Sequence, residues 1–380
     1  MDVEKKYISL SIPIVGEEEK SALREVIESG WLSMGAKVQA FEDAFAAHHG
    51  QKSAVAVNSC TAALHLILRA FDIGEGDEVL VPSVTFVATV NAVLYVGATP
   101  VFVDIEDIEH PLISPEDAAA KCSPKTKAAI VMHYGGYIAD FERWREFSDA
   151  HGIRLIEDAA HAPGVPGVGQ LSDASAFSFF ANKNMSTAEG GMVFSPDEDV
   201  LSTIRRLRGH GMTADTLVRH RGHAYSYDVT MLGYNYRLDE LRAAVGLVQL
   251  HHLTDWNRKR KMLAQLYREK LSSEIPSIRV PFDNGHPTSA HLMPVLLPAN
   301  CRREVVMDRL RGSGIQTSIH YPPVHLFSFY RGLYPDVVLP KSEEFCRREL
   351  SLPLHPALDE ADVEHVVACL RTALNHKSHK

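Results

Sequence analysis

The sequence predicts an α/β fold, in which helices cover both faces of a mainly parallel sheet. Between residues 53 and 158, short apolar segments alternate with segments of helical periodicity, which is the pattern of βαβ units. The chain of 380 residues also exceeds the size at which one hydrophobic core stops growing. We therefore expect a second, smaller domain beside the sheet.

The first residues predict two helices, over 16–29 and 38–48. Leu23, Val26 and Ile27 form one apolar stripe of the first helix. Between the helices lies Trp31, which we interpret as a core or interface aromatic because tryptophan is mostly buried for packing.

The alternating part follows. It predicts strands over 54–57, 78–81, 100–104, 128–132 and 153–158, and helices over 61–71, 87–95 and 141–150. Ligands in such folds lie beyond the carboxyl ends of the strands. The polar or aromatic clusters at 58–61, 83–86, 133–135 and 158–161 are therefore candidates for a binding site, together with the loop that holds Lys183.

Lys183 follows an apolar and aromatic run, 174–180, and precedes a small, polar loop that ends in Gly190-Gly191. Burial disfavours the charged form of lysine and lowers its pKa. A lysine in such a setting either extends its amine to the surface or is kept as a neutral nucleophile.

The second half of the chain predicts helices over 201–208, 238–252, 256–271, 302–313 and 359–375, and a strand over 291–297. The polar, histidine-rich segment 209–228 predicts a long exposed loop or arm. We expect a large domain over residues 1–255 and a small α+β domain over residues 256–380.

Composition limits the partners. With 45% apolar and 23% charged residues, the chain is an ordinary globular protein, and its net charge of −9 argues against a nucleic-acid or anionic-membrane partner. Five scattered cysteines fit a reducing compartment rather than a disulfide framework or a zinc site. The sequence shows neither a signal peptide nor a run long enough to span a bilayer, so we expect a cytoplasmic location.

Two segments suggest a cofactor site. Residues 58–63 pass from a strand into a helix whose first N–H groups lack partners and suit a phosphate, although a plain Ser/Thr N-cap explains them as well. Asp158 ends an apolar strand, as a ligand-facing carboxylate or as a capped or salt-bridged one. An aldehyde cofactor with a protonated ring nitrogen needs such a carboxylate and a lysine amine. Phe86 could cover its ring or belong to the core.

Other chemistries lack their motifs. The chain has no P-loop sequence, and the glycines of 164–169 are in the wrong order for a dinucleotide fingerprint. It has no G-x-S-x-G elbow of a serine hydrolase. His220 and His223 lack a third ligand at metal spacing, so no metal site is expected.

In this order, the motifs resemble the DegT/DnrJ/EryC1/StrS family of sugar aminotransferases, which are pyridoxal-phosphate (PLP) enzymes of aspartate-aminotransferase fold type I. The resemblance covers nearly the whole chain and implies a large domain with a mainly parallel seven-stranded sheet, plus the smaller α+β domain. It rests on Ser29-Gly-Trp-Leu, Asn58-Ser-Cys-Thr-Ala-Ala, Pro82-Ser-Val-Thr-Phe, Glu157-Asp-Ala-Ala-His, Phe177-Ser-Phe, Lys183, Glu189-Gly-Gly, Tyr234-Asn-Tyr-Arg, His320-Tyr-Pro and Leu352-Pro-Leu-His-Pro.

The resemblance implies a role for each matching residue. Lys183 is expected to be the catalytic Schiff-base lysine, and Asp158 to pair with the pyridinium nitrogen of PLP. His161, where the family often has glutamine, is expected to contact the ring hydroxyl, and Phe86 to stack on the ring. The remaining expectations are phosphate contacts from the backbone N–H groups of Thr61 and Ala62, from the Ser178 hydroxyl and, across a subunit interface, from Asn235, and sugar contacts from Trp31, His320 and Tyr321.

The expected reaction transfers an amino group from glutamate or glutamine to a keto-sugar, which we expect to be nucleotide-linked, in a homodimer with shared active sites. A keto-cyclitol (inosose) aminotransferase and a non-catalytic regulatory protein on the same fold stay as alternatives. A sugar dehydratase of this scaffold would carry histidine in place of Lys183. Two features depart from the family: Cys60 stands where glycine is usual, and 219–228 aligns with no known role.

Overall fold

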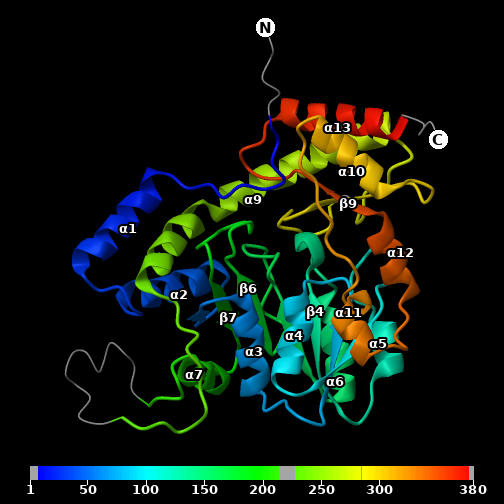
Figure 1. The fold of residues 1–380 in the computed structure, drawn as a ribbon. Coiled ribbons are helices and arrows are strands. Elements are labelled where there is room, and N and C mark those ends of the chain that lie inside the picture. The colour runs from blue at the N-terminus through cyan, green and yellow to red at the C-terminus, as the bar shows by residue number, and fades with distance from the viewer. Residues whose placement is uncertain (1–6, 214–226, 284, 376–380) are drawn as a thin grey trace.

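The structure, a computed structural model, describes residues 7–213, 227–283 and 285–375. Its centre is a seven-stranded sheet of order β1-β7-β6-β5-β4-β2-β3 (Figure 1). The strands are β1 (Val55–Val57), β2 (Glu78–Pro82), β3 (Thr99–Val103), β4 (Thr126–Met132), β5 (Arg154–Asp158), β6 (Ala174–Ser178) and β7 (Gly191–Phe194). Strand β7 runs antiparallel to β1 and β6, and the other pairs are parallel. The predicted mainly parallel sheet of seven strands is confirmed.

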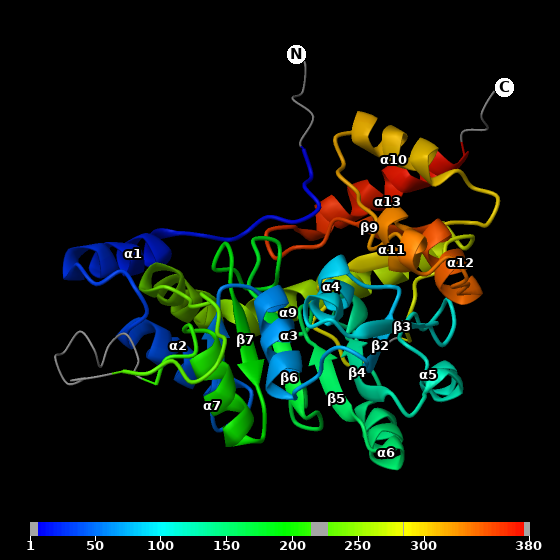
Figure 2. The ribbon, with the colours of Figure 1, turned by 60° about the horizontal axis from the view of Figure 1, so that its bottom comes forward.

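Alternating side chains of the sheet enter different cores, because successive residues of a strand point to opposite faces. Val79 and Val81 pack in the cluster under α3 (Cys60–Ala70), α4 (Val87–Tyr95) and α7 (Glu198–Leu207). Leu80, between them, packs on the other face with Trp144 of α6 (Phe141–His151). The turned view shows α3 and α7 beside the sheet and α6 at its lower edge (Figure 2).

One long helix connects the two ends of the molecule. Helix α9 (Glu240–Glu274) is continuous where the sequence predicted two consecutive helices. Its first half lies against α1 (Glu17–Ser29) and α2 (Ala36–His48). Farther along, Leu263, Tyr267 and Leu271 are buried in the core of the C-terminal part. The division between residues 255 and 256 falls inside this helix and stays a prediction.

The C-terminal part is α+β, as predicted. Its two-stranded antiparallel sheet pairs β8 (Met293–Leu296) with β9 (Glu349–Leu352), and α10 (Arg303–Gly312) and α13 (Glu360–Asn375) pack beside it. The residue pattern did not predict β6, β7 and β9 as strands, nor three short helices, α5 (Pro115–Lys121), α11 (Ser328–Leu333) and α12 (Pro340–Arg348). Elements this short show no clear hydrophobic period.

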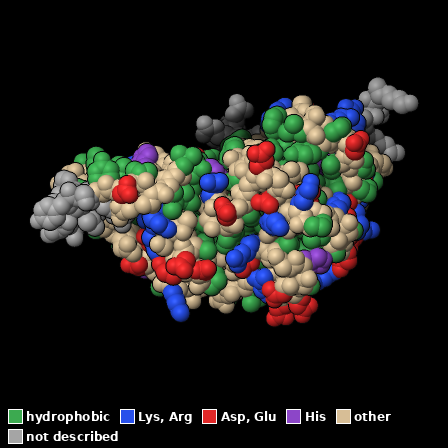
Figure 3. Space-filling model, turned by 90° about the horizontal axis from the view of Figure 1, so that it is seen from below, with side chains coloured by type: hydrophobic (Ala, Val, Ile, Leu, Met, Phe, Trp, Pro, Cys, Tyr) green, Lys and Arg blue, Asp and Glu red, His purple; other side chains and the backbone are tan. Residues whose placement is uncertain are grey.

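Most of the predicted arm, 214–226, lies outside the described residues. Among the helices that the structure describes, none is both long and apolar enough to cross a membrane. On the face seen from below, acidic and basic side chains are interspersed with apolar ones (Figure 3).

Candidate active site

A cavity of about 510 Å³ lies beyond the carboxyl ends of β4, β5 and β6, where the first part of the chain meets the C-terminal part. Four of the five clusters that the sequence singled out contribute to its wall. The residues that line it include Ser59, Cys60, Thr61, Phe86, Met132, Asp158, His161, Ser178, Asn182, Lys183, Glu189, Ser318, His320 and Tyr321. The cluster at 133–135 does not line the cavity: His133 is fully buried and forms a hydrogen bond with Glu157 at 3.0 Å.

Lys183 lies in the loop between β6 and β7, and its backbone N–H donates to the Phe180 carbonyl at 2.9 Å. The Nζ atom makes no hydrogen bond or ion pair with any residue that the structure describes. Burial lowers the pKa of Lys183 from 10.5 to about 8, against the opposing effects of Asp158 and Cys60. Roughly a tenth of the amine is therefore neutral, and nucleophilic, at pH 7, and this fraction rises with pH.

Asp158 is the last residue of β5, and its side chain is buried. Oδ2 accepts a hydrogen bond from the Thr89 hydroxyl at 2.7 Å, and Oδ1 accepts one from the Ala160 N–H at 3.2 Å. Burial raises the pKa of this carboxyl, while the two hydrogen bonds and Lys183 act to lower it. The carboxylate is thus held in place by neutral donors and is ready to receive a cation.

His161 is buried, and its hydrogen bonds fix its tautomer. The Gly135 N–H donates to Nδ1 at 3.2 Å, so Nδ1 carries no hydrogen. Nε2 therefore carries it and donates to the Tyr321 hydroxyl at 3.1 Å. Burial, with the nearby charge of Lys183, lowers the pKa of His161 well below its usual range, so the ring is neutral.

The start of α3 forms part of the cavity wall. Ser59 caps this helix by accepting the Ala62 N–H at 3.1 Å, which is the N-cap that the sequence analysis weighed against phosphate binding. Gly191 lies close behind: a Cβ there would stand 2.6 Å from the Ser59 carbonyl oxygen and 2.8 Å from the Cys60 nitrogen. Thr61 and Ser178 line the same cavity, and Ala62 lies one residue farther into the helix.

The outer wall carries three aromatic residues from two parts of the chain. Phe86, 56% exposed, lies with its ring centroid 6.1 Å from that of Tyr321. Burial raises the pKa of the Tyr321 hydroxyl, which keeps it neutral. His320 comes from the C-terminal part, and burial lowers its pKa to about 4. These residues form an apolar wall with neutral polar groups.

Three predicted site residues are not among those that line the cavity of the described chain: Ala62, which lies one residue beyond Thr61, Trp31 and Asn235. Trp31 lies in the connection between α1 and α2, beside Gly35. Asn235 is exposed, and its carbonyl accepts a weak hydrogen bond from Asn58 at 3.4 Å. Neither Trp31 nor Asn235 lies at the cavity of its own chain.

The sequence analysis missed Thr89, the residue that holds Asp158. Its signal was available, since Thr85 and Thr89 are one helical turn apart in a segment that is otherwise apolar. In the structure Thr89 is fully buried, with its hydroxyl 2.7 Å from that of Thr85. The contact between the tilted rings of His291 and His161, at a centroid distance of 4.2 Å, could not be predicted because the two residues are far apart in sequence.

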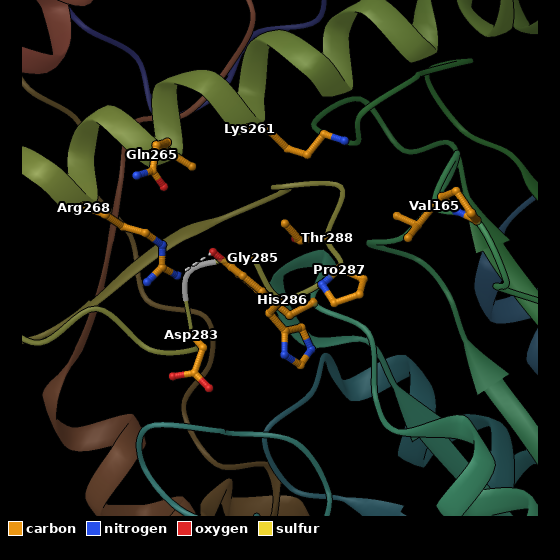
Figure 4. A pocket seen from close by; sticks show the side chains of 12 residues that line it. Val165, Lys261, Gln265, Arg268, Asp283, Gly285, His286, Pro287 and Thr288 are labelled. Atoms are coloured by element: carbon orange, nitrogen blue, oxygen red, sulfur yellow. Dashed lines mark hydrogen bonds between the residues drawn. The ribbon is translucent and has the colours of Figure 1, made fainter.

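A second cavity of about 400 Å³ lies against α9 (Figure 4). Lys261, Gln265 and Arg268 line it from the helix, and Asp283 and His286 from a facing loop. The Arg268 guanidinium already donates to the carbonyls of residues 281 and 282 and to the Tyr137 hydroxyl. None of the predicted site residues lines this cavity.

Comparisons with known proteins agree with this geometry. The sequence profile of the DegT/DnrJ/EryC1/StrS aminotransferase family matches residues 13–371. The spore coat polysaccharide biosynthesis protein SpsC of Bacillus subtilis is 39% identical over 378 residues, which are 96% of each chain. Among solved structures, Helicobacter pylori PseC, an aminotransferase involved in the biosynthesis of pseudoaminic acid, has a TM-score of 0.90 at 29% identity, with 97% of this chain and 99% of PseC covered. Spr1654 of Streptococcus pneumoniae, solved in its PLP form, has a TM-score of 0.89 at 28% identity, with 97% and 98% covered.

Proposed function

This chain belongs to the DegT/DnrJ/EryC1/StrS aminotransferase family and is a PLP-dependent sugar aminotransferase, and we propose that it aminates a nucleotide-linked keto-sugar with glutamate or glutamine as donor. The observation that carries the site assignment is the convergence of Lys183, Asp158 and His161 on one cavity. SpsC and PseC support a sugar acceptor, because their names connect them with a polysaccharide and with pseudoaminic acid.

The residues of the cavity fit the cofactor. PLP has an aldehyde, a ring nitrogen that must stay protonated, a ring hydroxyl and a phosphate. Lys183 offers a partly neutral amine for the aldehyde, and the buried Asp158 carboxylate has no ion-pair partner among the described residues, so it can take the protonated nitrogen. Thr61 and Ser178 line the cavity with hydroxyls suited to the phosphate. The Ala62 N–H would have to share or leave the Ser59 hydroxyl in order to join them.

When bound, the cofactor supplies an electron sink for the carbon that gives up its proton. The chain supplies the rest. Asp158 would hold the proton on the ring nitrogen, and the neutral His161 would contact the ring hydroxyl after leaving or sharing Tyr321. Nζ of Lys183 would take the proton from the reacting carbon and return it. Phe86 and Tyr321 would cover the ring.

The proposed assembly is a homodimer in which Asn235 reaches the cofactor phosphate of the partner. Its exposed position outside its own cavity supports this proposal. Trp31 would also approach the sugar. His320 and Tyr321 would contact the sugar from the cavity wall.

The test of substrate class is amination of a panel of ketones by the purified enzyme. The panel holds nucleotide-linked 3-keto- and 4-keto-sugars, the free sugars and inososes, each with glutamate or glutamine. We expect turnover with a nucleotide-linked sugar and a much higher KM for its free form, because remote parts of a substrate contribute binding energy. Preference for an inosose would contradict the proposal.

A further inference from the structure

Three polar side chains form a buried chain of hydrogen bonds that ends at the active-site cavity. Glu349 and Ser351 belong to β9 and are fully buried, and His320 is 8% exposed. Ser351 Oγ lies 2.5 Å from Glu349 Oε1 and 2.8 Å from His320 Nδ1. The other carboxyl oxygen, Oε2, accepts the backbone N–H of His320 at 2.9 Å. Both carboxyl oxygens of Glu349, Oγ of Ser351 and Nδ1 of His320 therefore have hydrogen-bond partners.

The other ring nitrogen is available. Nε2 of His320 has no hydrogen-bond partner in the part of the chain that the structure describes. This atom is also not fully buried. His320 lines the cavity that also holds Lys183 and His161. A ligand in the cavity can therefore exchange a hydrogen bond with Nε2.

We propose that Glu349, Ser351 and His320 form a proton relay, through which His320 exchanges a proton with an oxygen atom of the sugar. With Glu349 ionised, Ser351 donates to the carboxylate, Nδ1 donates to Ser351, and Nε2 presents a lone pair. A proton that arrives at Nε2 releases the Nδ1 hydrogen to Ser351 Oγ, and the Ser351 hydrogen moves to Glu349 Oε1. The proton count balances, and the imidazole ring is neutral before and after.

The surroundings suit a relay in which the His320 ring stays neutral and Glu349 is the group that titrates. Burial raises the pKa of the Glu349 carboxyl to about 8, against the effects of its hydrogen bonds with Ser351 and the His320 N–H and of the Arg303 charge. Burial lowers the pKa of His320 to about 4, with a further contribution from Lys183. The titratable or charged groups that face Glu349 are Arg303 from α10, Cys346 from α12, Tyr134 and Tyr321.

The test is the tautomer of His320, measured by NMR of protein labelled with ¹⁵N-histidine and assigned by difference with His320→Asn. In the native protein, hydrogen should move from Nε2 to Nδ1 as the pH rises through about 8, because Glu349 then ionises. In Glu349→Gln the amide NH₂ must donate to Ser351, so Nε2 should keep its hydrogen at every pH. In Ser351→Ala the tautomer should no longer follow Glu349. A His320 tautomer that is identical in native protein and Glu349→Gln across this range would overturn the relay.

The activity measurement uses the same variants. The inference rests on the proposed function, since it assigns the proton to a sugar oxygen. Glu349→Gln should lower kcat for the ketone by about 100-fold, which is typical of general acid–base groups, and leave the KM of the amino donor unchanged. Glu304→Gln, an exposed change in α10, is the control. Native kcat in Glu349→Gln would contradict the relay. A tautomer that switches in an enzyme that aminates no sugar would instead refute the proposed function.

Discussion

At the scale of single residues, burial gives the candidate site its chemistry. Lys183, Asp158 and His161 are ordinary residue types whose ionisation is changed by their surroundings: the amine is partly neutral, the carboxylate is held by neutral donors, and the imidazole is neutral with a fixed tautomer. Shifts of this kind cluster at functional sites, although structural pairs also produce them. Their energetic cost can be measured.

The buried amine of Lys183 should destabilise the protein in the absence of PLP. Its pKa is about 8 when folded and 10.5 in the reference state, so at pH 7 folding must desolvate a charge, and Lys183→Met should stabilise the cofactor-free protein by about 1–3 kcal/mol. Between these two pKa values the unfolded chain binds more protons, so native stability should rise with pH and the advantage of the variant should shrink. Urea unfolding at several pH values measures this difference. Lys125→Met, at an exposed position, should show neither effect.

Thr89 should matter for the cofactor although it does not line the cavity. Thr89→Val keeps the shape and removes the donor to Asp158, whose charged form loses stabilisation. We expect PLP affinity to fall about tenfold, which corresponds to roughly 1.4 kcal/mol. Titration of the visible band with PLP measures the affinity, and Thr372→Val, exposed on α13, is the control. Equal affinity in native protein and Thr89→Val would show that Asp158 does not depend on this bond.

At the scale of elements, the site is built where strand ends and helix starts meet. The parallel register places Met132 of β4 beside Asp158 of β5, and β6 delivers Ser178 next to Gly191. Because β7 returns antiparallel between β6 and β1, Gly191 also pairs with Val57, just before the start of α3. Strand β5 thus places the Asp158 carboxylate, β6 the Ser178 hydroxyl and β1 the start of α3 around one cavity.

Gly191→Ala tests this junction. The new methyl group would meet backbone atoms of Ser59 and Cys60, which cannot rotate away, so the start of α3 must shift. We expect a loss of about 1–3 kcal/mol of stability, as for overpacked cores, together with weaker PLP binding. Thermal unfolding and PLP titration measure the two effects. Gly332→Ala, in α11, where a methyl group meets nothing within 4 Å, should lower neither stability nor PLP binding. Unchanged PLP binding in Gly191→Ala would separate α3 from the cofactor.

The sequence predicted β1 to β5, β8 and the long helices because each shows a clear period or a continuous apolar run, as in 87–95 and 128–132. It did not predict β6, β7 and β9 as strands. It predicted most of the residues around the cavity because strand ends meet at one edge of a parallel sheet. Contacts between distant residues carry no local signal. The hydrogen bond between His161 and Tyr321 forms only because the C-terminal part packs against the sheet. The hydrogen bonds of Ser351 with Glu349 and His320 also join residues that no local pattern connects.

At the scale of the whole molecule, the exposed position of Asn235 makes the proposed dimer testable. If each site combines Lys183 of one subunit with Asn235 of the other, Lys183→Ala and Asn235→Ala should each be nearly inactive as a pure dimer. After the two variants are mixed and their subunits exchange, half of the dimers are hybrids with one intact site. Activity should then recover to about a quarter of the native level, as expected for a shared two-fold interface. Sedimentation measures the dimer, and a mixture that stays inactive while hybrids form would contradict shared sites.

The central claim, that Lys183 carries the transamination, is tested most directly by visible absorption. With PLP, the native protein should show a visible band that disappears when glutamate or glutamine is added and returns when the keto-sugar follows. Lys183→Ala should be folded by circular dichroism, should lack the native band, and should aminate no ketone. A native band that neither donor changes, or turnover by Lys183→Ala at the native rate, would contradict the claim.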